Sequence, residues 1–515
     1  MKPSGRRHWS DVAIRLHADD DVLVAIQPID AGAEIELPSG TITTRRPIPF
    51  CHKIALRGVA TGSPVRKFGQ IIGFAHKDIA AGDHVHSHNL ECGSHSRLDL
   101  NTSGSTADPP EPQGRTFEGY LRSDSRVGTR NYLAVIGTVN CSAAVVRRIA
   151  EHFSAKELAD FPNVDGVFAV AHQTGCGMSA SGLDRTYLRR TLSGIANHAN
   201  VFDCLLVGLG CEVNQPDQLI SPEQLASGRA KTPTILGIQE SGGIDATIQA
   251  GVEWVRRALP RANELRRTTQ PAGKLILGTN CGGSDGASGV TANPALGVAS
   301  DLLIAESGTS ILAETTEIYG AEHLLLLRAA SPDVAERLRE RIRWWEWYTS
   351  VFGASIDNNP SHGNKEGGLT TIFEKSLGAV AKGGSTSLRA VFGYAEPVTT
   401  NGLVFMDTPG FDPVSVTGIV AGGASVVVFT TGRGSVLGSK PAPTIKVATN
   451  TPMFERMRSD MDFNAGVALA GVLIESLGGK LFDLILETAS GKKTSSELQN
   501  LGVDEFVPWT VGPVL

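Results

Sequence analysis

The sequence of 515 residues contains no uninterrupted apolar run of about 20 residues, the length that a membrane-spanning helix requires. Its longest near-apolar runs, such as 424–429, have the length of a β-strand. The N-terminal segment carries early positive charge but lacks the apolar stretch of a secretory signal. These absences predict a soluble cytoplasmic protein without a membrane partner.

A basic excess is also missing. Lys and Arg number 47 against 53 Asp and Glu, which gives a formal net charge of −6. Because nucleic-acid-binding domains are typically basic, we expect no nucleic-acid partner. Hydrophobic residues make up 41% of the chain and charged residues 19%, a composition typical of folded proteins. The length corresponds to about three domains.

Several common catalytic motifs are absent. The segment 208–213 lacks the third glycine of a dinucleotide-binding GxGxxG loop, and 434–440 has neither the spacing nor the order of a P-loop. The chain contains no HExxH zinc motif. Kinases, simple dehydrogenases and zinc proteases therefore lose support.

The hydrophobic pattern divides the chain into four parts. Short β-like runs between turn signals predict a small β domain over 11–95, and a polar segment rich in Ser, Pro and Gly predicts a linker over 96–116. After this segment, strand-like runs alternate with helical stretches, which predicts an α/β fold with a mostly parallel sheet. We expect a catalytic α/β domain over 117–390 and a C-terminal α/β domain over 391–515.

Cysteine is scarce and unevenly placed. The seven cysteines form an odd number, and none follows Cys281, which argues against a disulfide framework. Four of them come directly after predicted parallel strands, at the edge where α/β sheets bind ligands: Cys141, Cys176, Cys211 and Cys281. One interpretation is an iron or iron–sulfur site with soft ligands, and the other is that each cysteine is a small buried hydrophobe.

A histidine cluster offers a second candidate metal site. His84, His86 and His88 alternate along the chain, so on a strand their side chains would point to one face. Three imidazoles on one face suit a first-row divalent metal. The alternative is a solvated strand face. These histidines and the cysteine edge are competing metal sites, or parts of one shared site.

Glycine-rich polar loops at 279–286, 358–368 and 430–435 predict a binding site for a polyhydroxylated acid. Glycine lets main-chain N–H groups approach an anion, and the side chains supply further donors. Arg433 and Asn364 are the candidates for holding the carboxylate and hydroxyl groups, because a guanidinium binds carboxylate with two parallel hydrogen bonds. The other candidate substrate-binding residues are Asn280, Ser284, Asp285 and Asn293.

These motifs together resemble the altronate/galactarate dehydratase family. The resemblance covers nearly the whole chain and is carried by these segments: 52–56, 82–89, 117–120, 130–132, 208–212, 281–286, 291–294, 363–368, 431–435 and 461–466. It implies a small N-terminal SAF (β-clip) domain and a larger Rossmann-like part. It also implies iron-dependent removal of water from an aldonate such as D-altronate, which yields a 2-keto-3-deoxy acid.

The resemblance leaves alternatives open. The substrate is D-altronate or, alternatively, galactarate. The leaving group is water or, as in sulfolactate sulfo-lyases, sulfite. A third alternative is a non-catalytic relative that only binds a sugar acid. The cofactor expected is Fe²⁺, with Mn²⁺, Mg²⁺ or an iron–sulfur cluster on the cysteines as alternatives. We also expect a homo-oligomer, namely a dimer.

Dehydration of a 2-hydroxy acid requires a base for the weakly acidic proton at C2 and help for the leaving hydroxyl group. His172 is the preferred base because it shares a strand end with Cys176, and Lys365 is the second choice. Glu314 and Glu317 follow a predicted strand and are candidates for an acid or a supporting role. The alternative for these two glutamates is favourable placement at a helix N-terminus.

Overall fold

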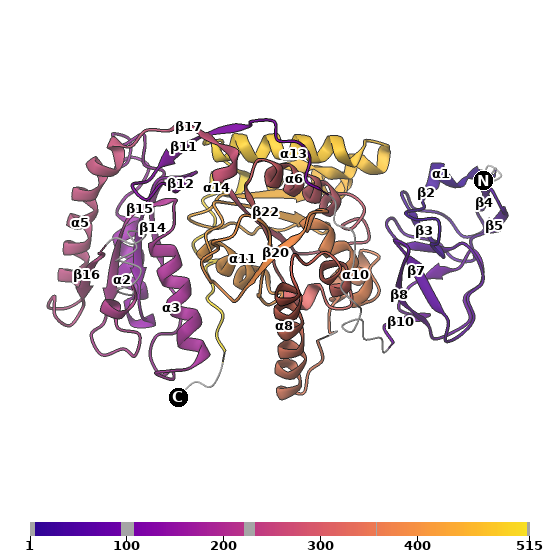
Figure 1. Ribbon diagram of the computed structural model, residues 1–515, viewed down its shortest axis with the longest axis horizontal. Coiled ribbons are helices and arrows are strands. Elements are labelled where there is room, and N and C mark those ends of the chain that lie inside the picture. Colours follow the sequence, from indigo (N-terminus) through magenta and orange to yellow (C-terminus); the bar gives the residue numbers. More distant parts are fainter. Residues whose placement is uncertain (1–5, 94–107, 221–231, 357, 512–515) are drawn as a thin grey trace.

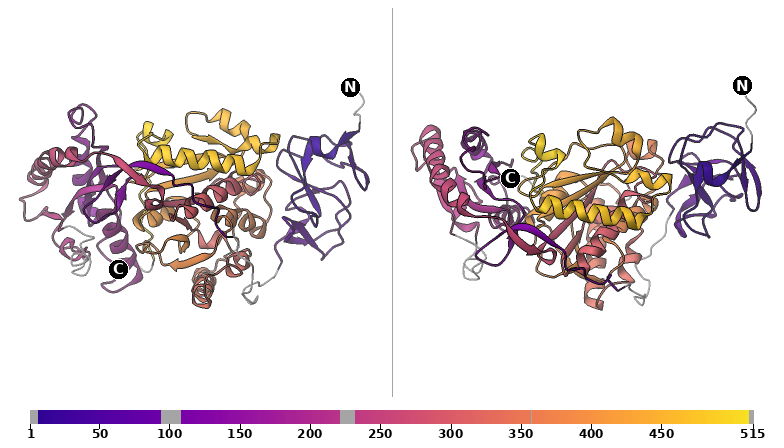
Figure 2. Two further views of the ribbon diagram at one scale, coloured as in Figure 1. Left: turned by 45° about the horizontal axis from the view of Figure 1, so that its top comes forward. Right: turned by 90° about the horizontal axis from the view of Figure 1, so that it is seen from above.

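The computed structural model describes residues 6–93, 108–220, 232–356 and 358–511. It has three parts in a row: an N-terminal β domain, a central α/β part built from the C-terminal half of the chain, and a smaller α/β part from residues between them (Figure 1). Figure 2 shows the same order from two further directions. The predicted linker lies largely outside the described residues, and its last residue already begins strand β11 (Thr116–Leu121).

The N-terminal domain consists of short, mostly antiparallel strands, as predicted. Its core is formed by Val12, Leu23, Ile35 and Ile54, which come from different strands and turns. Its elements are β1 (Arg7–His8), α1 (Trp9–Val12), β2 (Ala13–Ile14), β3 (Val22–Ala25), β4 (Glu34–Leu37), β5 (Gly40–Thr43), β6 (Lys53–Ala55), β7 (Pro64–Lys67), β8 (Gln70–Ala75), β9 (His84–Val85) and β10 (Leu90–Glu91).

The smaller α/β part is built on a four-stranded parallel sheet. Its strand order is β14 (Gly166–Val170), β13 (Tyr132–Gly137), β15 (Val201–Gly208) and β16 (Thr234–Gly237). Because alternate side chains of a strand point to opposite faces, Leu133 and Val135 pack against α2 (Ala143–Glu151) and α5 (Ile244–Glu264), whereas Ile136 packs toward α3 (Leu183–Ala196).

The central part contains a seven-stranded, entirely parallel sheet. Its order is β20 (Leu388–Phe392), β21 (Gly402–Met406), β19 (Thr309–Leu312), β18 (Ile276–Cys281), β22 (Val426–Thr431), β23 (Thr444–Ala448) and β24 (Phe463–Asn464). Strand β18 is buried along almost its whole length, as parallel strands covered by helices usually are. The mixed α/β architecture predicted from the sequence is confirmed.

The domain boundary expected at residue 390 falls inside strand β20 of this sheet. Strands from before and after that position are hydrogen-bonded neighbours, so residues 391–515 do not form a sheet of their own. The sequence pattern showed two sets of strands, but it did not show that both sets pair in one sheet. The junction with the smaller α/β part is a ribbon in which β11 pairs with β12 (Val127–Gly128) and β17 (Thr268–Pro271).

Helices cover both faces of the central sheet. On one face, Leu277 and Val428 pack with Leu296 of α6 (Ala292–Ala305) and Leu481 of α13 (Ile474–Ala489). The other helices of this part are α7 (Glu322–Leu326), α8 (Pro332–Val351), α9 (His362–Glu366), α10 (Ile372–Val380), α11 (Asp412–Ala421), α12 (Thr451–Arg456) and α14 (Ser495–Leu498). Within the ranges described, no helix combines the length and the apolar character needed to cross a bilayer.

Candidate functional site

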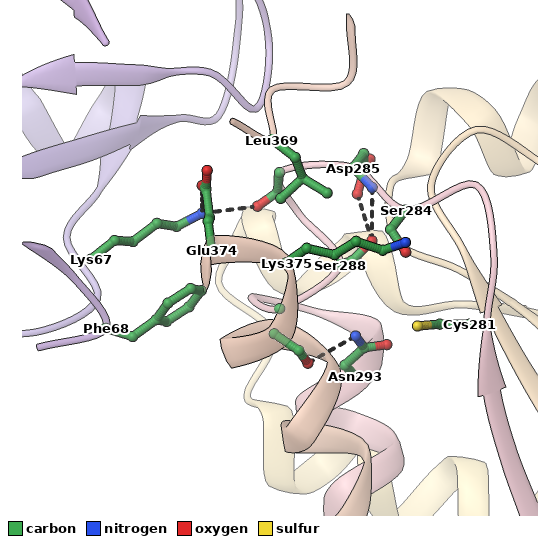
Figure 3. A pocket seen from close by; sticks show the side chains of 13 residues that line it. Lys67, Phe68, Cys281, Ser284, Asp285, Ser288, Asn293, Leu369, Glu374 and Lys375 are labelled. Atoms are coloured by element: carbon green, nitrogen blue, oxygen red, sulfur yellow. Dashed lines mark hydrogen bonds and ion pairs between the residues drawn. The ribbon is translucent and has the colours of Figure 1, made fainter. Parts of the chain in front are cut away.

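The central sheet has a switch point beside strand β18. From β18 the chain passes to β19 on one side, and it later returns to β22 on the other side. In parallel α/β sheets, ligands bind outside the carboxyl ends of the strands at such a point. A small pocket lies at this edge, and Lys67 and Phe68 of the N-terminal domain line it together with Cys281, Ser284 and other residues of the central part (Figure 3).

A buried acid, amine and thiol meet at the end of β18. Lys382 Nζ lies 2.9 Å from Cys281 Sγ and also donates to Glu314, and all three side chains are fully buried. Burial, followed by the Glu314 charge, raises the pKa of the Cys281 thiol well above its ordinary value. Burial raises the pKa of Glu314 to about 7, although the Lys382 ammonium group opposes this shift.

The backbone at Glu314 is strained. Its φ is 71° and its ψ is 68°, a left-handed conformation that residues other than glycine adopt rarely. The carboxylate accepts hydrogen bonds from Asn280 Nδ2 and from the main-chain N–H of Cys281, both at 3.1 Å. Strain of this kind persists only where surrounding contacts enforce it, and it concentrates at functional sites.

A second buried ion pair lies next to the first. Lys375 Nζ of α10 donates to Glu317 Oε1 at 2.6 Å and to Asn359 Oδ1 at 3.0 Å. Cys281 Sγ is 3.5 Å from the other oxygen of Glu317, so the two pairs form one cluster. Burial works to lower the pKa of Lys375, but the Glu317 carboxylate outweighs it and holds that pKa above its ordinary value.

Asp412 completes this cluster from the start of α11. A Cβ atom on Gly282 would lie 2.0 Å from Asp412 Oδ2, so the carboxyl group sits directly over the main chain that follows Cys281. Burial, together with the charges of Glu314 and Glu317, raises the pKa of Asp412 to about 8. This carboxyl group is therefore protonated at neutral pH, which makes it a hydrogen-bond donor and a proton source.

Two buried polar atoms beside the cluster have no hydrogen-bond partner among the described residues: Asn280 Oδ1 and Ser284 Oγ. Buried polar atoms are nearly always satisfied, so unpaired ones call for a specific explanation. Ser284 lines the pocket, and Figure 3 shows Lys375 extending toward it. Both atoms are therefore candidates for contact with a polar group of a ligand.

The other predicted substrate-binding residues make contacts within the protein. Asp285 accepts hydrogen bonds from Ser288, Thr449 and Asn450, which ties the loop after β18 to the loop after β23. Asn293 bonds Gly378 and Thr430, and Asn364 caps α9 and donates to the Ser284 carbonyl. Arg433 is half exposed and pairs with Glu366.

The predicted histidine cluster gathers at the surface where the N-terminal domain meets the loop after α9. Only His84 lies on a strand, since β9 ends at Val85, yet the rings of His84, His86 and His88 lie 5.3–6.5 Å apart between centroids. A fourth ring, His52, joins them, with its Nδ1 atom 2.9 Å from His84 Nε2. Burial lowers the pKa of His52 to about 4 and that of His84 to about 3, so both are neutral at physiological pH.

Two of these imidazoles are oriented by main-chain carbonyls. His52 donates its Nε2–H group to the Glu366 carbonyl at 3.1 Å, and His86 donates its Nε2–H group to the Lys365 carbonyl at 2.9 Å. Nδ1 of each ring therefore keeps its lone pair; on His86 it contacts the Ser87 hydroxyl group at 3.0 Å. Metal-binding histidines are typically held in this way, with one nitrogen fixed by a carbonyl.

The remaining predicted residues lie elsewhere. Cys141, Cys176 and Cys211 are exposed at the carboxyl edge of the four-stranded sheet, whereas Cys281 is buried in the other sheet, so the four cysteines do not form one site. His172 is buried, and its ring nitrogens contact the Gly137 carbonyl and Thr174 Oγ1. Lys365 is half-buried on α9.

Within the described residues, one group brings three potential metal-ligand atoms within 4.8 Å of one another: Cys281, Glu314 and Glu317. Its donor atoms would suit a divalent cation. However, the ammonium groups of Lys382 and Lys375 already lie on these carboxylates and neutralise them. Among the described residues, no lysine or arginine lies on the ring nitrogens of the imidazole cluster, but no three of these nitrogens come within 4.8 Å of one another.

Sequence reasoning missed four residues of these two clusters: His52, Lys375, Lys382 and Asp412. Their positions give no short motif, because each comes from an element far in sequence from its partners. Lys375 and Lys382 carried a weak signal, since they are charges, like Glu374, within the largely apolar stretch 372–382 that forms α10 and the turn after it. A charge inside a buried helix needs a partner of opposite charge.

The fold and the site define an α/β protein with an N-terminal SAF-type domain over a buried acid–amine cluster. Family models match almost the whole chain: the altronate/galactarate dehydratase SAF domain over residues 11–93, the D-galactarate dehydratase/altronate hydrolase second domain over 119–263, and the C-terminal domain of D-galactarate/altronate dehydratase over 272–514. The chain belongs to the altronate/galactarate dehydratase family.

Characterised relatives align over nearly their full length. The chain is 36% identical to altronate dehydratase of Escherichia coli (strain K12), over 94% of this chain and 96% of that protein. It is 35% identical to altronate dehydratase of Bacillus subtilis (strain 168), with the same coverage. It is 36% identical to galactarate dehydratase (L-threo-forming) of Escherichia coli (strain K12), over 93% of each chain.

Proposed function

We propose that this chain is a sugar-acid dehydratase, which removes water from an aldonic or aldaric acid and leaves a 2-keto-3-deoxy acid. The observation that carries the proposal is the buried cluster of Glu314, Lys382, Lys375 and Asp412 at the switch point, beside two unpaired polar side chains. The altronate and galactarate dehydratases among the relatives support the same reaction class.

The reaction needs two proton transfers of opposite direction. A base removes the proton from C2, and the electron pair of that bond moves toward the carboxylate to give an enediolate. The C3–O bond then breaks, the oxygen takes a proton from an acid, and water leaves. The resulting enol takes up a proton at C3 and releases the proton of its C2 hydroxyl group, which gives the 2-keto product. A positioned acid or base contributes roughly 10²–10⁴-fold to the rate of such steps.

Two carboxyl groups with raised pKa values supply these roles. Asp412, with a pKa of about 8, holds the proton that the leaving hydroxyl group needs. Glu314, with a pKa of about 7, accepts a proton near neutral pH and is our choice for the base. His172 and Lys365 stay predictions as alternative bases.

The cationic and unpaired polar groups bind and orient the acid. Lys375 and Lys382 place two positive charges where the enediolate develops negative charge, in a buried site where such charges act strongly. The Ser284 hydroxyl group can donate a hydrogen bond to a substrate hydroxyl group or accept one from it, and Asn280 Oδ1 can accept one. Lys67 and Phe68 of the N-terminal domain line the pocket at this edge.

We assign the divalent metal to the imidazoles of His52, His84 and His86, with His88 beside them. Fe²⁺ is our first choice, and Mn²⁺ or Mg²⁺ are the alternatives. When bound, such an ion supplies Lewis-acid polarisation of a substrate oxygen. The cytoplasmic location and the homodimer stay predictions from the sequence.

The metal assignment predicts which histidine substitutions remove bound iron. In the anaerobically purified protein, His52→Ala and His84→Ala should each lose most of the iron bound by the wild-type histidine cluster, because one nitrogen ligand is deleted in each. His17→Ala is the matched control, since His17 lies in the same domain and contacts Asp19. Iron content by elemental analysis decides, and unchanged iron in both variants would refute the assignment.

The dehydratase proposal is tested with a substrate panel. The Fe²⁺-loaded protein is offered D-altronate, galactarate, other aldonates and sulfolactate, and the 2-keto-3-deoxy product, pyruvate and sulfite are measured separately. Turnover of one sugar acid establishes the activity and its substrate together. Sulfite release without dehydration would overturn the dehydratase proposal in favour of a sulfo-lyase. Ligand-induced stabilisation without turnover would overturn it in favour of a sugar-acid-binding protein.

A further inference from the structure

Three cysteines outside the site described above share one edge of the smaller sheet. Cys141, Cys176 and Cys211 follow strands β13, β14 and β15, and in the sheet these three strands are direct neighbours with β13 in the middle. Because parallel strands place their carboxyl ends at one edge, the three loops lie side by side. Successive cysteines are separated by one helix and one strand, which is why no short metal-binding motif appears in the sequence.

Main-chain hydrogen bonds hold the three loops together. The N–H of Asn140, next to Cys141, donates to the Thr174 carbonyl at 2.9 Å. The N–H of Asn214 donates to the Gly175 carbonyl at 3.1 Å, next to Cys176. Asn214 Nδ2 also donates to the Thr138 carbonyl at 3.0 Å. The loops carrying the cysteines are therefore fixed relative to one another.

These cysteines are exposed, which is unusual for the residue type. Free cysteine is among the most buried residues in proteins, and Cys51, Cys204 and Cys281 of this chain follow that tendency. Burial in a core therefore does not explain Cys141, Cys176 and Cys211.

Two further features at this edge indicate a ligand. Asn214 is buried, and its Oδ1 atom has no hydrogen-bond partner among the described residues. A cavity adjoins the Cys176 loop, lined in part by Thr174, Met178 and Trp509. Cys176 itself lines this cavity, and the unpaired amide oxygen of Asn214 belongs to the loop bonded to Gly175 beside it.

We propose that Cys141, Cys176 and Cys211 bind an iron–sulfur cluster at the carboxyl edge of the four-stranded sheet. Thiolates are the ligands that select such clusters, and each thiol gives up its proton when its sulfur binds iron. The ligand atoms of Cys281, Glu314 and Glu317 lie within 4.8 Å of one another. Among the described residues, the three thiol sulfurs do not come that close to one another. A single ion needs its ligand atoms close together, whereas a cluster takes each thiolate on a different iron atom.

Three protein thiolates on a cubane cluster leave one iron without a cysteine ligand, because a cluster held by protein alone uses four cysteines. That iron is open to an exogenous oxygen ligand at the solvent-facing edge. The cluster is thus a second metal centre, separate from the imidazole cluster and from the acid–amine cluster beside β18.

The test measures cluster content directly. The full chain is purified anaerobically, reconstituted with ferrous iron and sulfide, and analysed for iron, acid-labile sulfide, visible charge-transfer absorbance and the electron paramagnetic resonance of the reduced protein. We expect about four iron and four sulfide per chain beyond the iron held by histidines. Cys141→Ala, Cys176→Ala and Cys211→Ala should each lose most of the sulfide and the absorbance.

Cys92→Ala and Cys281→Ala are the controls, since these cysteines lie in other parts of the chain and should leave the cluster intact. Circular dichroism checks that each variant folds, and we expect it to be unchanged in Cys141→Ala, Cys176→Ala and Cys211→Ala because these three side chains are exposed. Absence of sulfide in the reconstituted wild type, or equal sulfide in the triple Ala variant, overturns the proposal. The cluster is measured without substrate, so its failure and a failure of dehydratase activity are separate results.

Discussion

At the scale of single residues, the chemistry of the site depends on how burial and neighbouring charges set the protonation of each carboxyl group. Asp285 and Asp412 are both aspartates near the carboxyl edge of the same sheet. Asp285 is surrounded by hydroxyl and amide donors and therefore holds loops together. Asp412 is buried and faces Glu314 and Glu317, and burial together with these two charges keeps its proton in place. The same residue type thus has two roles, decided by its surroundings.

Substitution of Asp412 tests its role as proton donor. Asp412→Asn keeps the shape but carries no transferable proton, so we expect kcat for the preferred sugar acid to fall by about 10²–10⁴-fold with little change in KM. The matched control is Asp483→Asn, on the exposed side of α13, which should keep wild-type kinetics. Equal kinetics for the two variants would contradict the assignment.

The pH profile gives a second readout for the same residue. With a pKa of about 8, Asp412 is protonated below that pH and loses its proton above it. The activity of the wild type should therefore decline as the pH rises through about 8, and Asp412→Asn should lack this alkaline decline. Kinetics of both proteins between pH 6 and 9 measure the effect.

At the scale of elements, the last described segment joins the two α/β parts. The Trp509 ring stacks on Trp345 of α8 at 5.1 Å between centroids and on Tyr187 of α3 at 5.1 Å. Its main-chain N–H donates to the Tyr394 hydroxyl group. One side chain therefore contacts helices from both α/β parts, which gives this segment a structural role that its lack of regular secondary structure does not reveal.

Removal of this aromatic contact should loosen the junction. We expect Trp509→Ala to lower the free energy of unfolding by about 3–5 kcal/mol, because it deletes a large buried side chain. Trp347→Ala is the control, since Trp347 is 59% exposed and its loss should cost less than about 0.5 kcal/mol. Urea unfolding followed by circular dichroism measures both. A similar small loss in both variants would show that the stacked rings do not stabilise the junction.

At the scale of the whole molecule, buried charges attach the N-terminal domain to the central part. Lys53 and Lys67 of the N-terminal domain lie 2.8 and 2.9 Å from the two oxygens of Glu374 on α10, and all three side chains are buried. Burial alone would raise the pKa of Glu374, but the two ammonium groups lower it well below its ordinary value. The interface that closes the pocket therefore depends on one carboxylate.

Glu374→Gln should destabilise this interface strongly. It leaves two buried ammonium groups without their counter-charge, so we expect a loss of about 3–5 kcal/mol in unfolding free energy. Glu487→Gln is the control, because Glu487 and its partner Lys492 are both more than half exposed and their pair contributes less than about 1 kcal/mol. Urea unfolding measures the free energies, and limited proteolysis should release the N-terminal domain sooner in Glu374→Gln only.

The stabilising charge of Glu374 also sets a pH dependence. Because its pKa is lowered in the folded state, its contribution is fully present above the ordinary pKa of Glu and is lost as the pH falls toward the lowered value. The wild type should therefore lose stability below about pH 4, and Glu374→Gln should lack this component of the loss. Thermal unfolding between pH 3 and 7 compares the two proteins.

The sequence predicted those features that depend on neighbouring residues along the chain. The α/β alternation, the strand ends at Cys141, Cys176, Cys211 and Cys281, and the small N-terminal β domain all follow from local periodicity and turn chemistry. The gathering of His84, His86 and His88 followed from their alternation, even though the strand itself ends at Val85.

The sequence did not predict the partners that long-range packing brings together. His52 joins the other imidazoles only because β6 pairs with β9, and Lys382 reaches Glu314 only because the turn after α10 packs at the end of β18. Local patterns contain no information about such pairings. For the same reason, the boundary expected at residue 390 cuts through β20, which belongs to the same sheet as β18.

By itself, the sequence therefore determined the class of fold, the ends of the strands and the family to which the chain belongs, because these depend on residue order and local propensity. Only the tertiary structure decided that Cys281 lies apart from the other three strand-end cysteines, and that two lysines occupy the carboxylates beside it. The physical reason is that sheet order and domain docking are fixed by burial of apolar surface across the whole molecule, which places buried charges next to partners hundreds of residues away.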